Sequence, residues 1–435
     1  MVKFYIPLAL KYYMNTFISF WNHSPAFKNC VLKVKLSRPN RSNMISNPFI
    51  KKLIPTIFMS RFAIIICMLI IGNWFVFIPW KIEEIGLSKK NFGYILLLFG
   101  IGSIFSMQAT NKLLIPKLGP HFLLPFGVIA FSIIIFLWVS TETAFTFALV
   151  ALPEGLSFGV INPCAIVITV ETEQATGQRL LPLHHACFSI GSLFGVLIGG
   201  FFASLAFSPL SLFFALMMLG ILYGLTCLLF SNTQRQIRPV QKFRFGIPTG
   251  DTLFLGPVAA ISMGTIGIIL DWSALWLTRD IGLALALGGV GIFAFNSSEI
   301  VARMFGTSLI ARFGERGMGT SAMLLGCVSM AAATYSQSLA AIVFGFAALG
   351  FCSANFIPLV MGLAARRNPE NASKIVSDVT TVSFTGFLFG PPLVGLVAEY
   401  ISITACMYML SVIWGLSALM MRPYFLKRGH IPVLP

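Results

Sequence analysis

The chain has 435 residues, of which 57% are hydrophobic and only 10% charged, and its mean hydropathy is +0.87. A water-soluble domain carries about 25% charged residues, so this composition excludes a soluble globular protein. The net charge of +16 alone would fit a nucleic-acid partner, but the placement of the charges along the chain excludes that class as well.

Residues 1–53 are predicted to form a basic extension, with nine lysines and arginines and no acidic residue. Residues 4–21 are aromatic and apolar, but Pro7 and Lys11 interrupt them. They lack the longer apolar core and the small-residue cleavage site of a signal peptide. Two alternatives stay open: an interfacial amphipathic segment, or translation that starts downstream at Met44 or Met59.

Twelve apolar stretches follow, from about Thr56 to Met421. A bilayer core about 30 Å thick needs roughly 20 apolar residues per spanning helix. Lipid offers no partners for backbone N–H and C=O groups, so each stretch is predicted to be helical. The predicted spans are 56–80, 91–113, 122–140, 143–171, 181–207, 212–230, 253–278, 284–308, 318–336, 339–364, 376–400 and 402–421.

One polar segment, residues 231–252, divides these spans into six and six. It is predicted to be a basic linker between two bundles of six helices, residues 54–230 and 253–422, followed by a tail at 423–435. Two equal halves of this kind indicate parallel repeats around a site at the membrane midplane.

The distribution of positive charge predicts the orientation of the chain. With both termini in the cytoplasm, 24 of the 30 lysines and arginines lie on the inner side, and Arg61 and Arg303 lie within helices. The four on the outer side are Lys81, Lys89, Lys90 and Arg279. This asymmetry follows the positive-inside rule and indicates contact with anionic lipid rather than DNA.

Four stretches carry a family resemblance. They are LPLHHACFSIGSLFGVLIGG (181–200), ILDWSALWL (269–277), ARMFGTSLIARFGERG (302–317) and SDVTTVSFTGFLFGPPLVG (377–395). Over roughly residues 60 to 421 the chain resembles the major facilitator superfamily (MFS), and more narrowly its YbjJ-like branch, distantly related to fucose permeases. The resemblance implies an all-α integral membrane protein with 12 transmembrane helices in two bundles. The bundles would rock about a central cavity in a bacterial inner membrane, in a monomer.

The segment 306–317 resembles the inner-gate loop of the family, in which Arg303, Gly306, Arg312 and Gly314 match. Ala311 stands where the family usually has an acid. The equivalent loop at 114–119 has Pro116 at that position. Both copies thus lack the carboxylate that pairs across the gate.

Glycine and proline add two expectations about packing. Gly191, Gly195 and Gly199 recur four residues apart, and small residues at this spacing let helix backbones approach closely in lipid. The Gly-Pro-Pro sequence at 390–392 removes backbone donors and predicts a kink, which is either structural or a hinge.

Ionisable groups at bilayer depth cost several kcal/mol on insertion scales, so each is a candidate functional residue. Glu154 shares a predicted helical stripe with Phe158 and Asn162, which indicates a cavity wall. For Glu154 two hypotheses stay open: binding of substrate or a proton, and a structural hydrogen bond between helices. Asn162 stands where the resemblance implies an acid, which weakens proton coupling.

Glu299 and Arg303 are four residues apart, acid first, the favourable order for a helical ion pair. A structural or inner-gate pair is preferred over coupling chemistry. Asp378 begins a short polar stripe and has Arg366, Arg367 and Lys374 as candidate partners, so gating and binding are both open.

The remaining candidates each have an alternative. Asp271 with Trp272 forms either an outer gate or substrate contact, or an interfacial acid with an aromatic anchor. Asn73 and Trp74 either bind a polar ligand or belong to an aromatic belt. His185 is either a proton carrier or a structural residue at a helix start. Asn355 completes the midplane candidates.

We predict a secondary transporter, a symporter or antiporter, of a small polar or amphipathic solute, with proton coupling left open. The alternative is a non-transporting receptor or scaffold that retains the fold. The pattern contains no nucleophile–base pair, no metal-ligand cluster and no phosphate-binding loop, so neither an enzyme, a cofactor nor a nucleic-acid partner is expected.

Overall fold

The computed structural model describes residues 48–177, 180–230, 252–367 and 372–426. Within these ranges, the side chains of some residues, including Asn355 and those at 361–377, also lie outside the description. The expected extension up to residue 47, the linker apart from Thr252 and the tail from residue 427 are not described. The chain divides into two compact units, Met1–Pro55 and Thr56–Pro435, and the second contains nearly all of the described residues.

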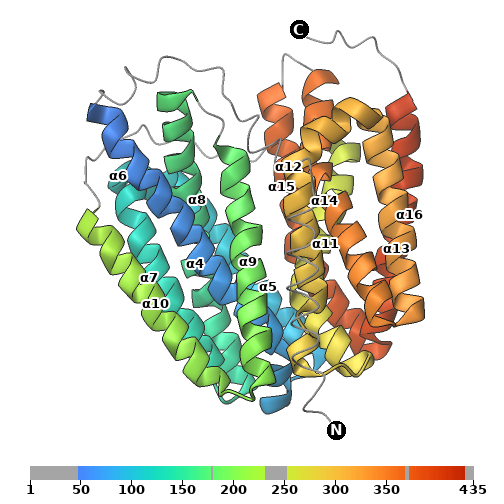
Figure 1. The fold of residues 1–435 in the computed structure, drawn as a ribbon, viewed down its shortest axis with the longest axis horizontal. Helices are drawn as coiled ribbons and strands as arrows, with labels where there is room; N and C mark the ends of the chain where they lie inside the picture. The colour runs from blue at the N-terminus through green and yellow to red at the C-terminus, as the bar shows by residue number, and fades with distance from the viewer. Residues whose placement is uncertain (1–47, 178–179, 231–251, 368–371, 427–435) are drawn as a thin grey trace, which may run out of the picture. The chain divides into compact units, whose positions relative to one another are not determined.

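The described part of the chain is helical throughout, and its helices form two groups joined by the linker (Figure 1). The first half contains α4 (Pro48–Glu84), α5 (Lys89–Ala109), η1 (Thr110–Leu114), α6 (Ile115–Leu118), α7 (Pro120–Val139), α8 (Ala144–Thr176), α9 (Leu181–Ser204) and α10 (Pro209–Phe230).

The second half contains α11 (Thr252–Leu275), η2 (Trp276–Asp280), η3 (Leu285–Leu287), α12 (Val290–Arg316), η4 (Gly317–Ser321), α13 (Ala322–Ser336), α14 (Leu339–Arg367), α15 (Ala372–Tyr400) and α16 (Ile403–Leu426). We call the end of the bundle where α4 ends and α5 begins the Glu84 end, and the opposite end, where α8 ends, the Thr176 end. In Figure 1 the Glu84 end is at the bottom.

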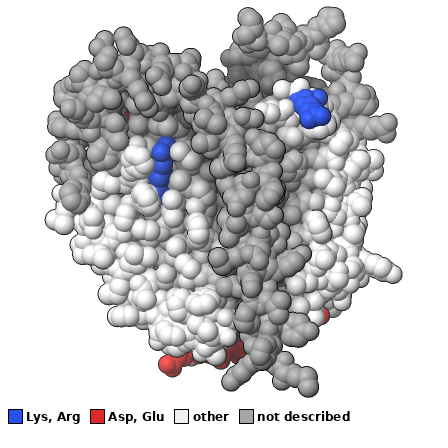
Figure 2. Space-filling view, viewed as in Figure 1, with Lys and Arg blue, Asp and Glu red and all other residues white. Residues whose placement is uncertain are grey.

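Eleven of the described helical segments are long and apolar enough to cross a membrane, and α14 adds a shorter apolar stretch, Leu339–Ala354. The twelve predicted spans are therefore confirmed as helices, with boundaries shifted by a few residues. On the face drawn in Figure 2, the described residues show basic side chains at two places in the upper part and acidic groups at the lower end, and the described surface between them is free of charged side chains. Such an uncharged band is what a lipid-facing surface requires.

The predicted close helix packing at Gly191 and Gly195 is confirmed. A Cβ atom at Gly191 would meet the backbone of Ile65 on α4, and one at Gly195 would meet the backbone of Leu69 and Gly72. Similar contacts join α8 to α5 and α15 to α11. Without a hydrophobic driving force between helices in lipid, this packing is a main source of cohesion.

The inner-gate segment differs from the prediction. The sequence predicts a loop at 306–317, but α12 continues to Arg316 and its helical conformation breaks only at Gly314, where φ is 69°. The equivalent glycine of the first half, Gly119, has φ of 81°. Both positions favour glycine because an added Cβ would be strained there, so the motif marks one backbone turn in each half.

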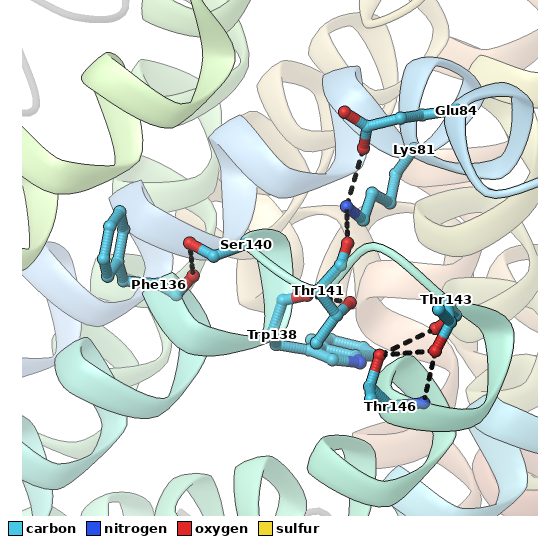
Figure 3. A network of polar contacts seen from close by, with 8 residues as sticks. All are labelled: Lys81, Glu84, Phe136, Trp138, Ser140, Thr141, Thr143 and Thr146. Carbon is cyan, nitrogen blue, oxygen red and sulfur yellow. Dashed lines mark hydrogen bonds and ion pairs between the residues drawn. The ribbon is translucent and has the colours of Figure 1, made fainter.

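A buried lysine fixes the α7–α8 connection to the end of α4 (Figure 3). The Lys81 side chain is 1% exposed, and its Nζ lies 2.7 Å from Glu84 Oε2. The same nitrogen donates to the backbone carbonyl of Thr141, which follows α7. Thr143 then caps α8 by accepting from the Thr146 backbone N–H. Lys81, predicted only as a charge on the outer side, is therefore a structural residue.

We expect Gly155→Ala to lower stability by about 1–3 kcal/mol, because the added methyl group would overlap the Phe99 backbone of α5. The matched control is Gly317→Ala, whose Cβ would make an ordinary 3.4 Å contact with the Phe313 side chain. That variant should keep or slightly raise the melting temperature, since alanine favours a helix over glycine by about 1 kcal/mol. Thermal unfolding of both purified variants in detergent tests this, and equal losses would contradict it.

Candidate functional site

The two halves are joined at mid-depth by a ladder of polar contacts between α9 and α12. Asn296 Nδ2 donates to Ser192 Oγ at 2.9 Å. Ser189 Oγ donates to Glu299 Oε2 at 3.0 Å and accepts from Arg303 Nη1 at 2.8 Å. The predicted ion pair is confirmed, with Arg303 Nη2 2.9 Å from Glu299 Oε1. We call these five residues the α9–α12 ladder.

Sequence reasoning found the charged members of the ladder but missed Ser189 and Asn296. Both are neutral and sit in apolar stretches, where a single serine or asparagine gives little signal. The spacing of His185, Ser189 and Ser192, which places polar groups on one face of α9, could have identified Ser189. The spacing of Asn296, Glu299 and Arg303 on one face of α12 could have identified Asn296.

Glu154 lies on α8, with 1% of its surface exposed. Ser157 Oγ, one turn away on the same helix, is 3.4 Å from Glu154 Oε2, and Glu154 Oε1 has no hydrogen-bond partner. Of the two hypotheses for Glu154, the hydrogen bond to another helix is not present among the described residues. Phe158, expected on the same cavity wall, instead packs against Phe99 of α5 and Phe131 of α7.

Asn162 contacts α9 through His184, the neighbour of the predicted histidine. Asn162 Oδ1 lies 3.3 Å from His184 Nε2, while His184 is 0% exposed and its Nδ1 has no partner. His185 is exposed and interacts electrostatically with Arg303 of the ladder. The two adjacent histidines thus face different surroundings, because successive helical residues differ in direction by about 100°.

Further contacts between the halves lie toward the Glu84 end. The Phe92 ring of α5 packs edge-on against Trp272 of α11, with centroids 5.2 Å apart. Trp272 Nε1 donates to the Pro391 carbonyl of α15 at 3.0 Å. A Cβ at Gly93 would lie 3.2 Å from the Cα of Gly395, so α5 and α15 pack backbone to backbone.

Two polar contacts also join the halves at this end. Arg279 Nη2 lies 2.8 Å from Glu83 Oε2, and the Lys90 backbone N–H donates to Glu399 Oε2 at 3.2 Å. Both side chains of the ion pair are substantially exposed, so its own contribution to stability is about 0–1 kcal/mol.

The tryptophans of α11 and η2 are not the interfacial anchors that the sequence left open. Trp272 and Trp276 are both fully buried. Trp276 Nε1 donates to Thr404 Oγ1 at 3.0 Å. Asp271 is half-buried beside Trp272, and no hydrogen bond or ion pair to it is present within the described ranges.

Asn73 and Trp74 lie in the packed interior of the first half. The Trp74 ring lies tilted against Trp138, with centroids 4.9 Å apart, and its centroid is 5.9 Å from that of Phe147. Asn73 is fully buried and donates to the Leu69 carbonyl of its own helix at 2.8 Å, while its Oδ1 has no hydrogen-bond partner. Both side chains are buried, so neither belongs to an aromatic belt at the membrane surface.

The remaining candidates are only partly described. Asp378 is buried on α15, but the side chains of Arg366, Arg367 and Lys374 lie outside the description, as does that of Asn355. Arg312 is exposed, with its guanidinium 5.6 Å from the Phe313 ring. Within the described residues, no three histidine, cysteine or acidic side chains are placed to hold a metal ion.

Comparisons with known proteins agree with this architecture. The family model described as Major Facilitator Superfamily matches residues 252–433. An uncharacterised MFS-type transporter of Yersinia pestis is 27% identical over 368 residues, which is 83% of this chain and 92% of that protein. The membrane protein MosC of Rhizobium meliloti is 26% identical over 358 residues, 80% of this chain and 85% of MosC.

Solved structures show the same fold at low sequence identity. The nucleoside transporter NupG gives a TM-score of 0.66 at 12% identity, covering 86% of this chain and 99% of NupG. A bacterial homologue of the human lysosomal transporter Spinster, solved inward-facing and unoccupied, gives 0.64 at 15% identity, covering 89% and 100%. The family model thus matches the second half of the chain, and the relatives and solved structures resemble the chain over most of both halves.

Proposed function

We propose that the chain is a secondary transporter that moves a small polar or amphipathic solute across the membrane by alternating access. The observation that carries this proposal is the distribution of contacts between the halves. These contacts run from Glu83–Arg279 at the Glu84 end to the α9–α12 ladder at mid-depth. Two helical halves joined over only part of their length can rock against each other by breaking these contacts in turn.

The orientation follows from the same proposal. The positive-inside rule puts the Glu84 end outside and both termini in the cytoplasm of a bacterial inner membrane. The contacts at the Glu84 end then close the outer side, which is an inward-facing arrangement. The Spinster homologue with a similar fold was solved in an inward-facing state, which supports this orientation. The narrower placement in the YbjJ-like branch rests on the four sequence stretches.

The polar groups at mid-depth indicate the solute class. Helical rise places Glu154 about 15 Å from the Glu84 end and Asp271 about 14 Å from it, one acid in each half. Neither has a partner from another helix among the described residues. Few charges at this depth favour a solute with several hydroxyl or amide groups over a multiply charged one.

We assign the α9–α12 ladder to the gate between the halves. Glu299 neutralises Arg303 within one helix, so the pair can stay intact while its contact with Ser189 breaks. This arrangement lets the halves separate without leaving an unpaired buried charge, which would cost several kcal/mol. The comparisons give no support to the alternative of a receptor or scaffold.

Transport is tested by a thermal-shift screen of the purified protein against sugars, amino acids, nucleosides and drugs, followed by uptake of each hit into proteoliposomes. We expect saturable uptake, and Glu154→Gln should reduce it at least tenfold if Glu154 carries a proton or the solute. Uptake measured with and without a pH gradient tests proton coupling, and equal uptake rates would show that transport is not coupled to protons. A chain that binds hits but gives no flux under any gradient would contradict the proposed function.

Closure at the Glu84 end is tested by cross-linking. We expect a bifunctional thiol reagent between Glu83→Cys and Arg279→Cys, in a background without other cysteines, to abolish uptake, because the outer side could no longer open. The control is Thr143→Cys with Thr146→Cys, within one half, where the hydroxyls lie 2.8 Å apart. Its cross-link should leave uptake unchanged. Full uptake by the cross-linked Glu83–Arg279 protein would rule out this gate.

The ladder predicts that Glu299 and Arg303 act as a unit. Glu299→Gln and Arg303→Gln should each lower the melting temperature, and the double variant should recover part of the loss, with a coupling energy of about 1–3 kcal/mol. Ser189→Ala keeps the ion pair but removes the hydrogen bonds of Ser189 between the halves. It should therefore change the yield of the cross-link between Glu83→Cys and Arg279→Cys more than it changes the melting temperature. Additive single effects would show that the pair is not coupled.

A further inference from the structure

Arg61 is a charged residue without a counter-ion among the described ion pairs. It lies on α4, near the Thr176 end, and its Nε and Nη2 atoms are buried without a hydrogen-bond acceptor. A guanidinium stays charged in proteins, so these donors cannot be satisfied by losing a proton. No described acidic side chain forms an ion pair with it.

The register of the α4–α9 contact places Arg61 opposite His184. Ile65 and Met68 of α4 meet Gly191 of α9, and Gly72 meets Gly195. Counted from the contact of Met68 with Gly191, Arg61 and His184 each lie seven residues, or two turns, toward the N-terminus of their helix. The two side chains interact electrostatically, which agrees with this placement.

His184 supplies the second half of the site. It is 0% exposed, its Nε2 is engaged by Asn162 at 3.3 Å, and its Nδ1 has no partner. The structure places Asn162 Oδ1 toward Nε2, and a turn of the amide by about 180° would place its nitrogen there instead. With the amide nitrogen toward Nε2, the His184 proton resides on Nδ1 and becomes a donor beside Arg61.

We propose that Arg61 and His184, with Asn162 setting the tautomer, form a binding site for one oxyanion, a carboxylate or a phosphate group. Such a group would accept charge-assisted hydrogen bonds from Nε–H and Nη2–H of Arg61. It would accept a third hydrogen bond from Nδ1–H of His184. The oxyanion can come from a soluble solute or from the headgroup of an anionic lipid. The site does not depend on the transport proposal, because binding can be measured without flux.

The carboxylates at mid-depth do not serve Arg61. Glu154 is eight residues before Asn162 on α8, about 12 Å along the helix axis. Glu299 is paired with Arg303 on the other side of α9. Because the described protein residues leave Arg61 without a counter-ion near the Thr176 end, a bound anion is the group that would neutralise it.

The test uses the full chain in lipid-free detergent and inorganic phosphate as the probe, with ionic strength held constant by chloride. We expect a saturable rise in melting temperature for wild type, and at least a tenfold weaker apparent affinity in Arg61→Gln. Lys117→Gln removes one exposed positive charge near the same end and should behave as wild type. Arg61→Lys and His184→Gln should each weaken binding, and they decide the matter if Arg61→Gln does not fold.

Nanodiscs distinguish the two sources of the oxyanion. If the site holds a lipid headgroup, phosphatidylglycerol nanodiscs will abolish the phosphate effect that phosphatidylcholine nanodiscs retain. If it holds a soluble anion, the effect will persist in both. No phosphate effect in wild type, or an equal effect in wild type, Arg61→Gln, Arg61→Lys and His184→Gln, would overturn the site.

Discussion

The ion pair between Glu299 and Arg303 is the interaction on which the mid-depth contact between the two halves depends. Each charge would be costly at this depth without the other, and their i,i+4 spacing pairs them within α12. Because the pair is complete on one helix, Ser189 of α9 adds a single neutral hydroxyl that contacts both charges. The halves are thus held together at mid-depth by hydrogen bonds, which can break without exposing an unpaired charge to lipid.

The contact at the Glu84 end has a different physical basis. There α5 and α15 approach through Gly93 and Gly395, and the aromatic edge of Phe92 rests on Trp272. The Trp272 indole is held by the Pro391 carbonyl, so the ring has a fixed orientation. Packing of this kind depends on shape, and a gap of about 0.5–1 Å already removes a quarter to a half of its dispersion energy. The polar ladder at mid-depth and the closely packed contact at the Glu84 end are therefore two separate contacts, and each can break as the halves move.

The sequence predicts the twelve helical spans and the Glu299–Arg303 pair because both depend on local patterns, apolar length and helical spacing. It does not predict which side chains meet across helices. From the sequence, Asn73 and Trp74 are candidates to bind a ligand, but they pack within the first half. The sequence cannot distinguish these two roles, because a polar or aromatic residue at bilayer depth gives the same pattern in a binding site and in a packed helix contact. The sequence favours His185 over His184, because the family motif marks a position and not the direction in which a side chain points. The inner-gate loop is expected from its glycines, yet a helix tolerates all of them except Gly314, whose positive φ breaks it.

Helix α9 connects these features because its two faces serve different partners. His184, Gly191 and Gly195 lie toward α4, while His185, Ser189 and Ser192 lie about 100° away toward α12. The glycines fix α9 against α4 by backbone contact, so α9 must move together with Arg61 and the rest of the first half. On the α12 side, the ladder joins α9 through hydrogen bonds of Ser189 with Glu299 and Arg303 and of Ser192 with Asn296. An anion bound between Arg61 and His184 would therefore strengthen a contact within the first half and leave the ladder free to open, which separates ligand binding from the movement between halves.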